Sequence, residues 1–215
     1  MTDRLDMQQT RDMFLYVADQ FETNKPFLTE IDSAIGDGDH GIGMSVGFAN
    51  AGKIVKEKEF QTVNEMFHQI GMAMIGSMGG ASGVIFGTMF MGGAKNAAPF
   101  AAFDLEAVTH LFGGSLQAIK DRGKAQLGDK TMVDALEPAI ASLQESLRQS
   151  KTLLDGLREA EASAKAGMEK TKEYIAKFGR AKSLGERALG HQDAGATSVW
   201  IIFKSMREWV EGIHE

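Results

Sequence analysis

Apolar residues recur every three or four positions along nearly the whole chain, a spacing that places them on one face of an α-helix. Phe14, Val17 and Phe21 form one such stripe, and a longer one runs from Leu105 to Ile119. No segment shows the strict alternation of apolar and polar residues that is typical of a half-buried strand. The pattern therefore predicts an all-α bundle of about eight helices.

Caps and prolines mark where the predicted helices begin and end. Pro26 ends the first helix, because the residue before a proline disfavours the helical conformation. Asp104 and Asp193 each precede an apolar stripe and are candidate N-caps. Residues 79–94 lack a polar face and suit either a buried strand or a central helix; their small residues at three- and four-residue spacing favour the helix. The stripes cover residues 14–21, 28–35, 42–49, 63–74, 79–94, 105–119, 136–147, 153–175 and 194–209.

Composition narrows the class of protein. A length of 215 residues suits one large domain or two small ones, and three prolines with no linker favour a single domain spanning residues 1–215. The net charge of −6 argues against a nucleic-acid partner. The chain has no cysteine, its first six residues lack an apolar signal core, and no run is apolar enough for a membrane span. We therefore expect a cytoplasmic protein without a membrane segment.

The segment of residues 29–43 carries three carboxylates, Asp32, Asp37 and Asp39, among four glycines, with a histidine directly after them. Carboxylate oxygens are the ligands that Mg²⁺ prefers, although solvated acidic turns are also common. On one straight helix Asp37 would lie off the face that Asp32 and Asp39 share. A break at Gly36 would bring the three together. The residue types favour a metal or metal–phosphate site over an acidic turn.

Three further glycine-containing segments carry residues that suit a phosphate or a nucleotide. Residues 79–83 open a helix, where unpaired amides attract phosphate, and the same glycines also suit close packing. Residues 122–132, with Lys124 and Lys130, either face a nucleotide or form a solvated connection. Residues 179–195 form a polar loop with four glycines, which suggests a flap.

Charge supports a combination of these segments. Three aspartates and an ADP together carry about −6, and two Mg²⁺ ions supply about +4. Arg180 and a lysine would offset the remainder, although most surface arginines bind no ligand. An acidic protein that binds an acidic ligand needs metal between them. The four segments therefore predict a magnesium–nucleotide site.

Taken in this order, the segments resemble the ADP-binding L subunit of dihydroxyacetone kinase. The matching motifs are Asp32…Gly36-Asp-Gly-Asp-His-Gly41, Gly79-Gly-Ala-Ser-Gly83, Arg122-Gly-Lys…Gly128-Asp-Lys-Thr-Met132 and Gly179-Arg-Ala…Leu184-Gly-Glu-Arg…Gly190-His-Gln-Asp193.

The resemblance implies a barrel of eight antiparallel helices with the nucleotide site at one end. It implies that Asp32, Asp37 and Asp39 hold two Mg²⁺ ions that bridge the nucleotide phosphates, and that these aspartates and Arg180 are catalytic. The nucleotide is expected against His40, Gly41, Ile42, Gly43, Ala81, Ser82, Gly123, Met132, Arg180, Asp193, Ala194 and Gly195.

The function implied is that of a phosphotransferase subunit that uses ADP or ATP and acts only with a partner. The substrate, dihydroxyacetone, is held on a separate K subunit. In one branch of the family a phosphohistidine on an M subunit recharges bound ADP, which is the expectation here; in the other branch ATP is the donor and exchanges. Two alternatives remain: a kinase for another short ketose such as erythrulose, and a non-catalytic nucleotide sensor. The oligomeric state, a homodimer included, stays open.

Two positions depart from the pattern of the family. Members often carry a polar residue where Gly43 stands, so a contact on the phosphate side is expected to be missing. The final loop usually reads Asp-Pro-Gly, whereas here Ala194 replaces the proline. The stiffness of that loop, and with it the retention of nucleotide, is therefore in question.

Overall fold

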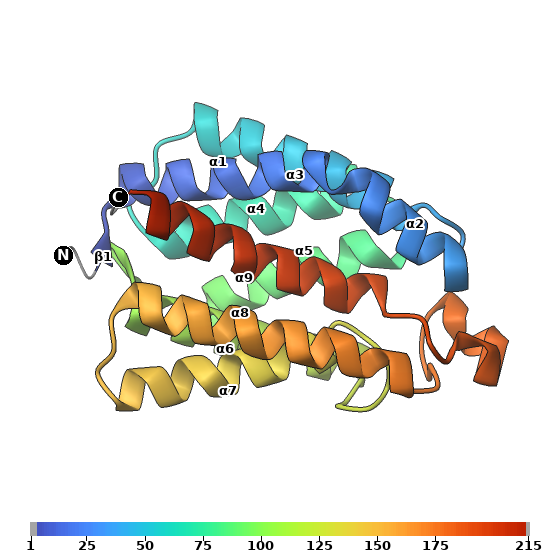
Figure 1. Cartoon of the computed structure of the whole chain (residues 1–215). Helices are drawn as coiled ribbons and strands as arrows, with labels where there is room; N and C mark the ends of the chain where they lie inside the picture. Colours follow the sequence, from blue (N-terminus) through green and yellow to red (C-terminus); the bar gives the residue numbers. More distant parts are fainter. Residues whose placement is uncertain (1–3, 214–215) are drawn as a thin grey trace.

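The computed structural model describes residues 4–213 as an elongated bundle whose helices run back and forth along one axis (Figure 1). Within this range there are nine α-helices, two 3₁₀ segments and one antiparallel pair of two-residue strands, so the predicted all-α fold is confirmed. The α-helices are α1 Met7–Thr23, α2 Lys25–Ile35, α3 His40–Glu57, α4 Val63–Ser77, α5 Gly80–Asn96, α6 Leu105–Gly123, α7 Val133–Arg148, α8 Leu153–Lys170 and α9 Ala194–Gly212. The 3₁₀ segments are η1 Thr171–Glu173 and η2 Arg180–Ala188, and the strands are β1 Arg4–Leu5 and β2 Phe103–Asp104.

The predicted helix caps are present. The Asp104 carboxylate accepts a hydrogen bond from the Ala107 amide at 2.8 Å, and the Asp193 carboxylate accepts one from the Ala196 amide at 2.7 Å. Each bond satisfies an amide that the first turn of a helix leaves without a carbonyl partner. Pro26 lies in the first turn of α2, directly after α1 ends. These local signals place the boundaries between helices.

Two boundaries differ from the prediction. α8 ends at Lys170 instead of continuing to Ile175, whose side chain is 46% exposed. The reason lies at Thr171: its hydroxyl donates to the Met168 carbonyl and accepts from the Asp193 amide, which draws the chain away from the helix axis. α7 begins earlier than its apolar stripe, so Pro138 lies in its second turn.

Phenylalanines from different helices form the centre of the core. The rings of Phe14 on α1 and Phe67 on α4 meet edge to face with centroids 5.3 Å apart, and Phe67 meets Phe90 on α5 at the same distance. Residues 79–94 lie on a helix, as predicted, and α5 packs closely on both neighbours. A Cβ atom at Gly87 would come within 2.3 Å of Ile75 on α4, and one at Gly93 would come within 2.6 Å of the Leu111 carbonyl on α6.

Because most successive helices reverse direction, four connections meet at one end of the bundle, at the right of Figure 1. They are residues 36–39 before α3, residues 78–79 before α5, the α6–α7 loop (residues 124–132) and the α8–α9 segment (residues 171–193). Each of the four glycine-containing segments singled out above includes part of one of these connections. No helix within residues 4–213 is long and apolar enough to cross a membrane.

Candidate functional site

Three carboxylates converge where α2 meets α3. Asp32, Asp37 and Asp39 each offer an oxygen, and these oxygens lie within 4.8 Å of one another; we call this group the acidic cluster. α2 ends at Ile35, and the chain turns back at Gly36, so the predicted break is present. A Cβ atom on Gly36 would lie 2.3 Å from Oδ1 of Asp32, so glycine allows the chain to pass directly over that carboxylate. The next glycine, at position 38, has the left-handed φ of 76° that closes the turn.

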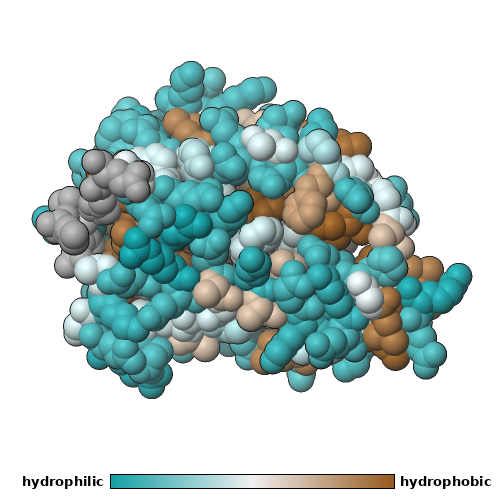
Figure 2. Space-filling view, in the orientation of Figure 1, coloured by the Kyte–Doolittle hydropathy of each residue, from teal (hydrophilic) through white to brown (hydrophobic). Residues whose placement is uncertain are grey.

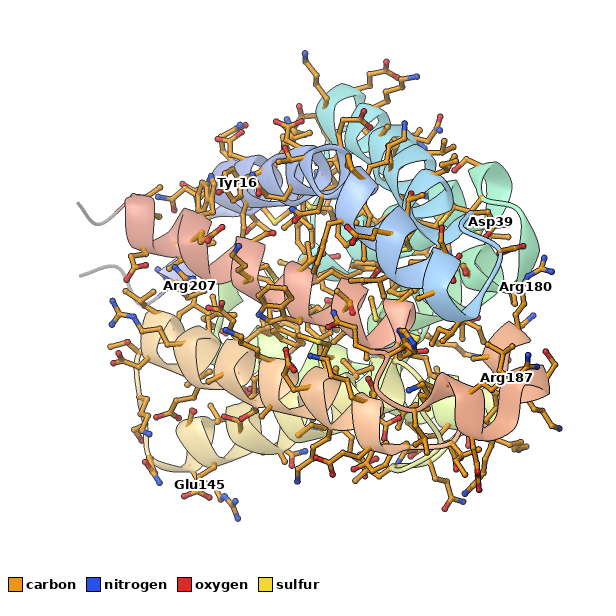
Figure 3. All side chains as sticks on the ribbon, turned by 45° about the vertical axis from the view of Figure 1, so that its right-hand side comes forward. Tyr16, Asp39, Glu145, Arg180, Arg187 and Arg207 are labelled. Carbon is orange, nitrogen blue, oxygen red and sulfur yellow. The ribbon has the colours of Figure 1, made fainter. Side chains whose placement is uncertain are left out.

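The charges of the acidic cluster are only partly balanced. Burial, with the neighbouring carboxylates Asp37 and Asp32, raises the pKa of Asp39, and Arg180 acts in the opposite direction. Arg180, at the start of η2, pairs with Asp37 at 2.6 Å between Nη2 and Oδ2. Figure 3 shows Asp39 and Arg180 near each other at the same end of the molecule. Three hard oxygen donors that repel one another fit a divalent cation such as Mg²⁺.

His40 connects the N-terminal parts of three helices. It begins α3, and its amide donates to Oδ2 of Asp32 at 3.2 Å. Its ring nitrogens lie 2.8 Å from the Ser198 hydroxyl on α9 and 3.4 Å from the Ser82 hydroxyl on α5. Burial lowers the pKa of the imidazole, against the opposing effects of Asp32 and the Ala194 carbonyl. A neutral, buried ring therefore aligns the acidic cluster with the start of α5.

Ser198 was not predicted to belong to the site. Its side chain is fully buried, and it lies in the first turns of α9 within a mostly apolar stretch. The sequence signal for it is weak, because a serine on a helix face also bonds to its own backbone, as Ser205 does on the same helix.

The start of α3 packs closely on α2. A Cβ atom at Gly41 would lie 2.4 Å from the Lys25 carbonyl, so this glycine brings the two helices together. Ile42 next to it is half exposed, and a Cβ atom at Gly43 would meet nothing nearer than the Met78 side chain at 3.9 Å. The structure therefore leaves room for a side chain at position 43.

The remaining predicted residues lie at the same end of the bundle. Gly123 ends α6 and Met132 caps α7, while Ala81 and Ser82 are in the first turn of α5. A Cβ atom at Gly195 would lie 3.4 Å from Cβ of Met132, so the starts of α7 and α9 adjoin. The last two predicted residues, Asp193 and Ala194, begin α9.

Asp193 has the most perturbed carboxyl of the predicted residues. Burial raises its pKa to about 7; the bond from the Ala196 amide and the charge of Lys130 oppose the shift, and Asp134 and Asp32 add to it. The carboxyl of Asp193, at the edge of the site, therefore titrates near neutral pH.

Lys130 and Lys124 differ from what the loop pattern suggested. Lys130 neither faces an open site nor lies in solvent: it is 2% exposed, and its ammonium donates to the carbonyls of Thr171 and His191. Lys124 is exposed at the end of α6, with a left-handed φ of 59°.

Comparison with known proteins identifies the family of this chain. Residues 34–208 match the family model of the DAK2 domain, which covers most of the chain. The chain belongs to the DAK2 family. The predicted resemblance is therefore confirmed.

Similar DAK2 proteins align with nearly the whole chain. It is 38% identical over 189 residues to the "PEP-dependent dihydroxyacetone kinase 1, ADP-binding subunit DhaL" of Listeria innocua, covering 87% of this chain and 89% of the relative. It is 36% identical over 188 residues to the corresponding ADP-binding subunit of Escherichia coli, covering 87% and 90%.

Solved structures share the fold. The dihydroxyacetone kinase of C. freundii superposes with a TM-score of 0.71 at 27% identity, over 92% of this chain and 34% of that one. The structure of the kinase from C. freundii in complex with AMP-PNP and Mg²⁺ gives a TM-score of 0.70 at 28% identity, over 92% and 33%. This chain therefore spans about a third of the length of the solved kinases.

Proposed function

We propose that this chain is the nucleotide-binding phosphotransferase subunit of a dihydroxyacetone kinase. As a single domain of residues 1–215, it transfers a phosphoryl group to dihydroxyacetone held on a separate K subunit. The observation that carries the proposal is the convergence of Asp32, Asp37 and Asp39 beside Arg180. Relatives that align over about nine tenths of their own length are named ADP-binding subunits of this kinase, which supports it.

The residues of the site would have different roles in phosphoryl transfer: metal binding, anion binding and stabilisation of charge. Asp32, Asp37 and Asp39 would hold two Mg²⁺ ions, which when bound neutralise charge on the phosphate oxygens. The first turn of α5 offers backbone amides, and His40 orients the Ser82 hydroxyl beside them, so that an anion is bound there. Arg180 carries a permanent positive charge to the same place and would stabilise charge that develops during transfer.

The nucleotide would lie between the α3 and α5 starts on one side and the α6 end and α9 start on the other. On the first side the proposed contacts are His40, Gly41, Ile42, Gly43, Ala81 and Ser82. On the second they are Gly123, Met132, Arg180, Asp193, Ala194 and Gly195. With water excluded from this space, hydrolysis would compete less with transfer.

The names of the relatives support a phosphoprotein as the donor. The Listeria and Escherichia subunits are named PEP-dependent, and a relative from Lactococcus lactis, 35% identical over 192 residues, is named PTS-dependent. We therefore propose that ADP stays bound and is recharged by a phosphohistidine on an M subunit. We propose a cytoplasmic location on the same ground, because a phosphoprotein donor of this kind would have to meet the chain there.

A second candidate is the same module in an erythrulose kinase with ATP as the donor. The observation that favours it is 31% identity over 187 residues to an L-erythrulose 1-kinase of Mycolicibacterium smegmatis, although the chain covers only 32% of that enzyme. The lower identity and coverage rank it second.

Calorimetry of ADP binding in the presence of Mg²⁺ tests the site. We expect wild type and the control Asp19→Asn, whose side chain is exposed on α1, to bind with the same affinity. Asp37→Asn removes one carboxylate of the acidic cluster and should weaken binding by about 10- to 100-fold. Equal binding by wild type and Asp37→Asn would refute the metal site.

The reaction is tested by mixing the protein with K subunits and either ketose. One set of mixtures receives a phosphorylated M subunit and the other receives ATP. Phosphorylated dihydroxyacetone with the M subunit supports the main proposal, and phosphorylated erythrulose with ATP supports the second. Nucleotide binding with no phosphorylated ketose in any mixture would identify a nucleotide sensor instead.

A further inference from the structure

Lys130 is a buried cation that the proposed chemistry does not use. Its side chain is 2% exposed, and burial lowers the pKa of its ammonium, with Asp193 and Asp134 opposing. Its backbone has a left-handed φ of 59°, a conformation that residues with a side chain rarely adopt. A buried ammonium and an unfavourable backbone both cost stability unless specific contacts offset them. The contacts of Lys130 are therefore informative.

The ammonium of Lys130 joins the two ends of the α8–α9 segment. It donates to the carbonyl of Thr171, directly after α8, and to the carbonyl of His191, two residues before Asp193, the N-cap of α9. The Gly190 amide also donates to the Lys172 carbonyl at 2.8 Å, so the ends of the segment lie side by side. Lys130 itself belongs to the α6–α7 loop and thus fixes both ends to a different part of the chain.

A second tie between the same segments lies at the surface. Lys177 pairs with Asp129 at 2.6 Å between Nζ and Oδ1, and its amide donates to the Asp129 carbonyl at 3.1 Å. The Lys177 side chain is 68% exposed, so water competes for its charge. Lys177 therefore serves as a control for Lys130, because it ties the same two segments together at the surface and through a carboxylate.

The ends that Lys130 fixes carry residues of the proposed site. Two residues after it along the loop is Met132, which adjoins Gly195. Two residues beyond His191 is Asp193, whose amide donates to the Thr171 hydroxyl at 2.9 Å. Arg180 lies in the part of the segment between the fixed ends. A change in these ends would therefore move the side of the site that the α6 end and the α9 start form.

We infer that Lys130 is a positioning residue: by clasping the carbonyls of Thr171 and His191, it holds the α8–α9 segment closed over the site and sets how fast nucleotide leaves. The effect on the segment is a property of the protein alone. The effect on nucleotide release rests on the proposed function.

We call the two bonds from Lys130 to the carbonyls of Thr171 and His191 the clasp. Hydrogen exchange followed by mass spectrometry tests the clasp without ligand. Lys130→Met keeps the length and apolar stem of the side chain but removes the donors. A hydrogen bond to a charged donor changes the equilibrium between closed and open states by a factor of about 10 to 100. The exchange rates of amides in residues 172–192 should therefore rise by about that factor, while the amides of α4 and α5 keep their rates. The control Lys177→Met should change exchange by no more than about threefold, and Lys130→Arg, which retains donors, should restore most of the protection.

Nucleotide release is measured on the same variants with Mg²⁺ and a fluorescent ADP analogue. We expect release to accelerate about tenfold or more in Lys130→Met, and to stay within about threefold of wild type in Lys177→Met. Unchanged exchange and unchanged release in Lys130→Met would overturn the inference. A uniform rise in exchange across segment and core alike would overturn it too, because that is the signature of a general structural role.

Wild-type protein supplies a check that does not depend on the variant folding. The clasp predicts that the amides of Gly190 and Asp193 exchange more slowly than those of residues 180–188, and equal rates would overturn it. Failure of the wild type to bind ADP would overturn the proposed function and leave the ligand-free comparison as the test of the clasp.

Discussion

Arg180 and Asp37 form an ion pair, with Nη2 and Oδ2 2.6 Å apart, that links the α8–α9 segment to the acidic cluster. The arginine is 68% exposed and the aspartate 33%, so the pair contributes little to stability. The pair matters because it brings a positive charge from the α8–α9 segment to the acidic cluster. The α8–α9 segment, to which Arg180 belongs, also carries the exposed apolar side chains Ile175, Phe178 and Leu189. Figure 2 shows apolar (brown) surface at the right-hand end of the molecule, where this segment lies.

The first prediction concerns Arg180 in the proposed reaction. Arg180→Gln should lower kcat for ketose phosphorylation about 10²- to 10³-fold, because a single donor that stabilises transition-state charge contributes that much. ADP binding should weaken less than about tenfold. The control is Arg187→Gln, on the same 3₁₀ segment and visible in Figure 3, whose guanidinium contacts the Leu184 carbonyl. Equal kcat values for the two variants would contradict the role of Arg180.

The second prediction compares two glycines of the same segment. Gly36→Ala should lower the free energy of unfolding by about 1 to 3 kcal/mol and weaken Mg²⁺ binding, because the added methyl overlaps the Asp32 carboxylate. Gly43→Ala should raise it by about 0.5 to 1 kcal/mol, since position 43 is inside α3 and has room for a methyl group. Urea unfolding measures both. Similar losses at the two positions would contradict the packing described for Gly36.

The third prediction concerns the missing proline. Ala194 is the first residue of α9, where an amide has no earlier carbonyl to bond, and Asp193 has φ −76° and ψ 131°, which suits a residue before proline. Ala194→Pro should therefore raise the free energy of unfolding by about 0.4 to 1 kcal/mol. If the proline also stiffens the loop, ADP should be released more slowly from this variant than from wild type.

A control for this substitution lies two residues away. The Ala196 amide donates to the Asp193 cap, and Ala196→Pro would remove that bond. The control should lose about 0.5 to 2 kcal/mol. Destabilisation by both prolines would show that position 194 does not have the geometry described.

The fourth prediction is a dependence of stability on pH. Asp193 has its pKa raised from 3.8 to about 7, so between these values the folded protein holds a proton that the unfolded chain has lost. Stability from this group is complete below pH 3.8 and is lost as pH rises through 7. The shift from 3.8 to about 7 corresponds to a loss of about 4 kcal/mol across that range, at about 1.36 kcal/mol per pKa unit.

Asp193→Asn isolates this effect, because asparagine also caps helices and does not titrate. Urea unfolding without metal gives the free energy of unfolding of wild type and variant at pH 5, 6 and 7. This free energy should fall more steeply with pH in wild type than in the variant. Parallel pH profiles would show that Asp193 titrates normally.

Local patterns predicted most of the helices correctly. The 3.6-residue stripes and the caps Asp104 and Asp193 are short-range features, and a sequence states them directly. The break at Gly36 followed from geometry on a single helix. The end of α8 did not, because it depends on a bond from Asp193, which is 22 residues away from Thr171 in the chain.

The candidate site shows the same division. The acidic cluster could be predicted because its three aspartates lie within eight residues of one another. Ser198 and Lys130 could not, since Ser198 meets His40 across 158 positions and Lys130 meets His191 across 61. From the sequence alone, a lysine in a glycine-rich loop is expected to be exposed. Its burial depends on the two carbonyls that its ammonium binds, and these come from a distant part of the chain.

The position of the chain ends has a consequence for longer members of the family. Arg4 and Ile213 lie at the end of the bundle opposite the acidic cluster (Figure 1). α9 has 19 residues and so spans about 28 Å. A substrate site on any domain joined near either end would have to come back along that length to meet the acidic cluster, a distance that about eight or nine extended residues span.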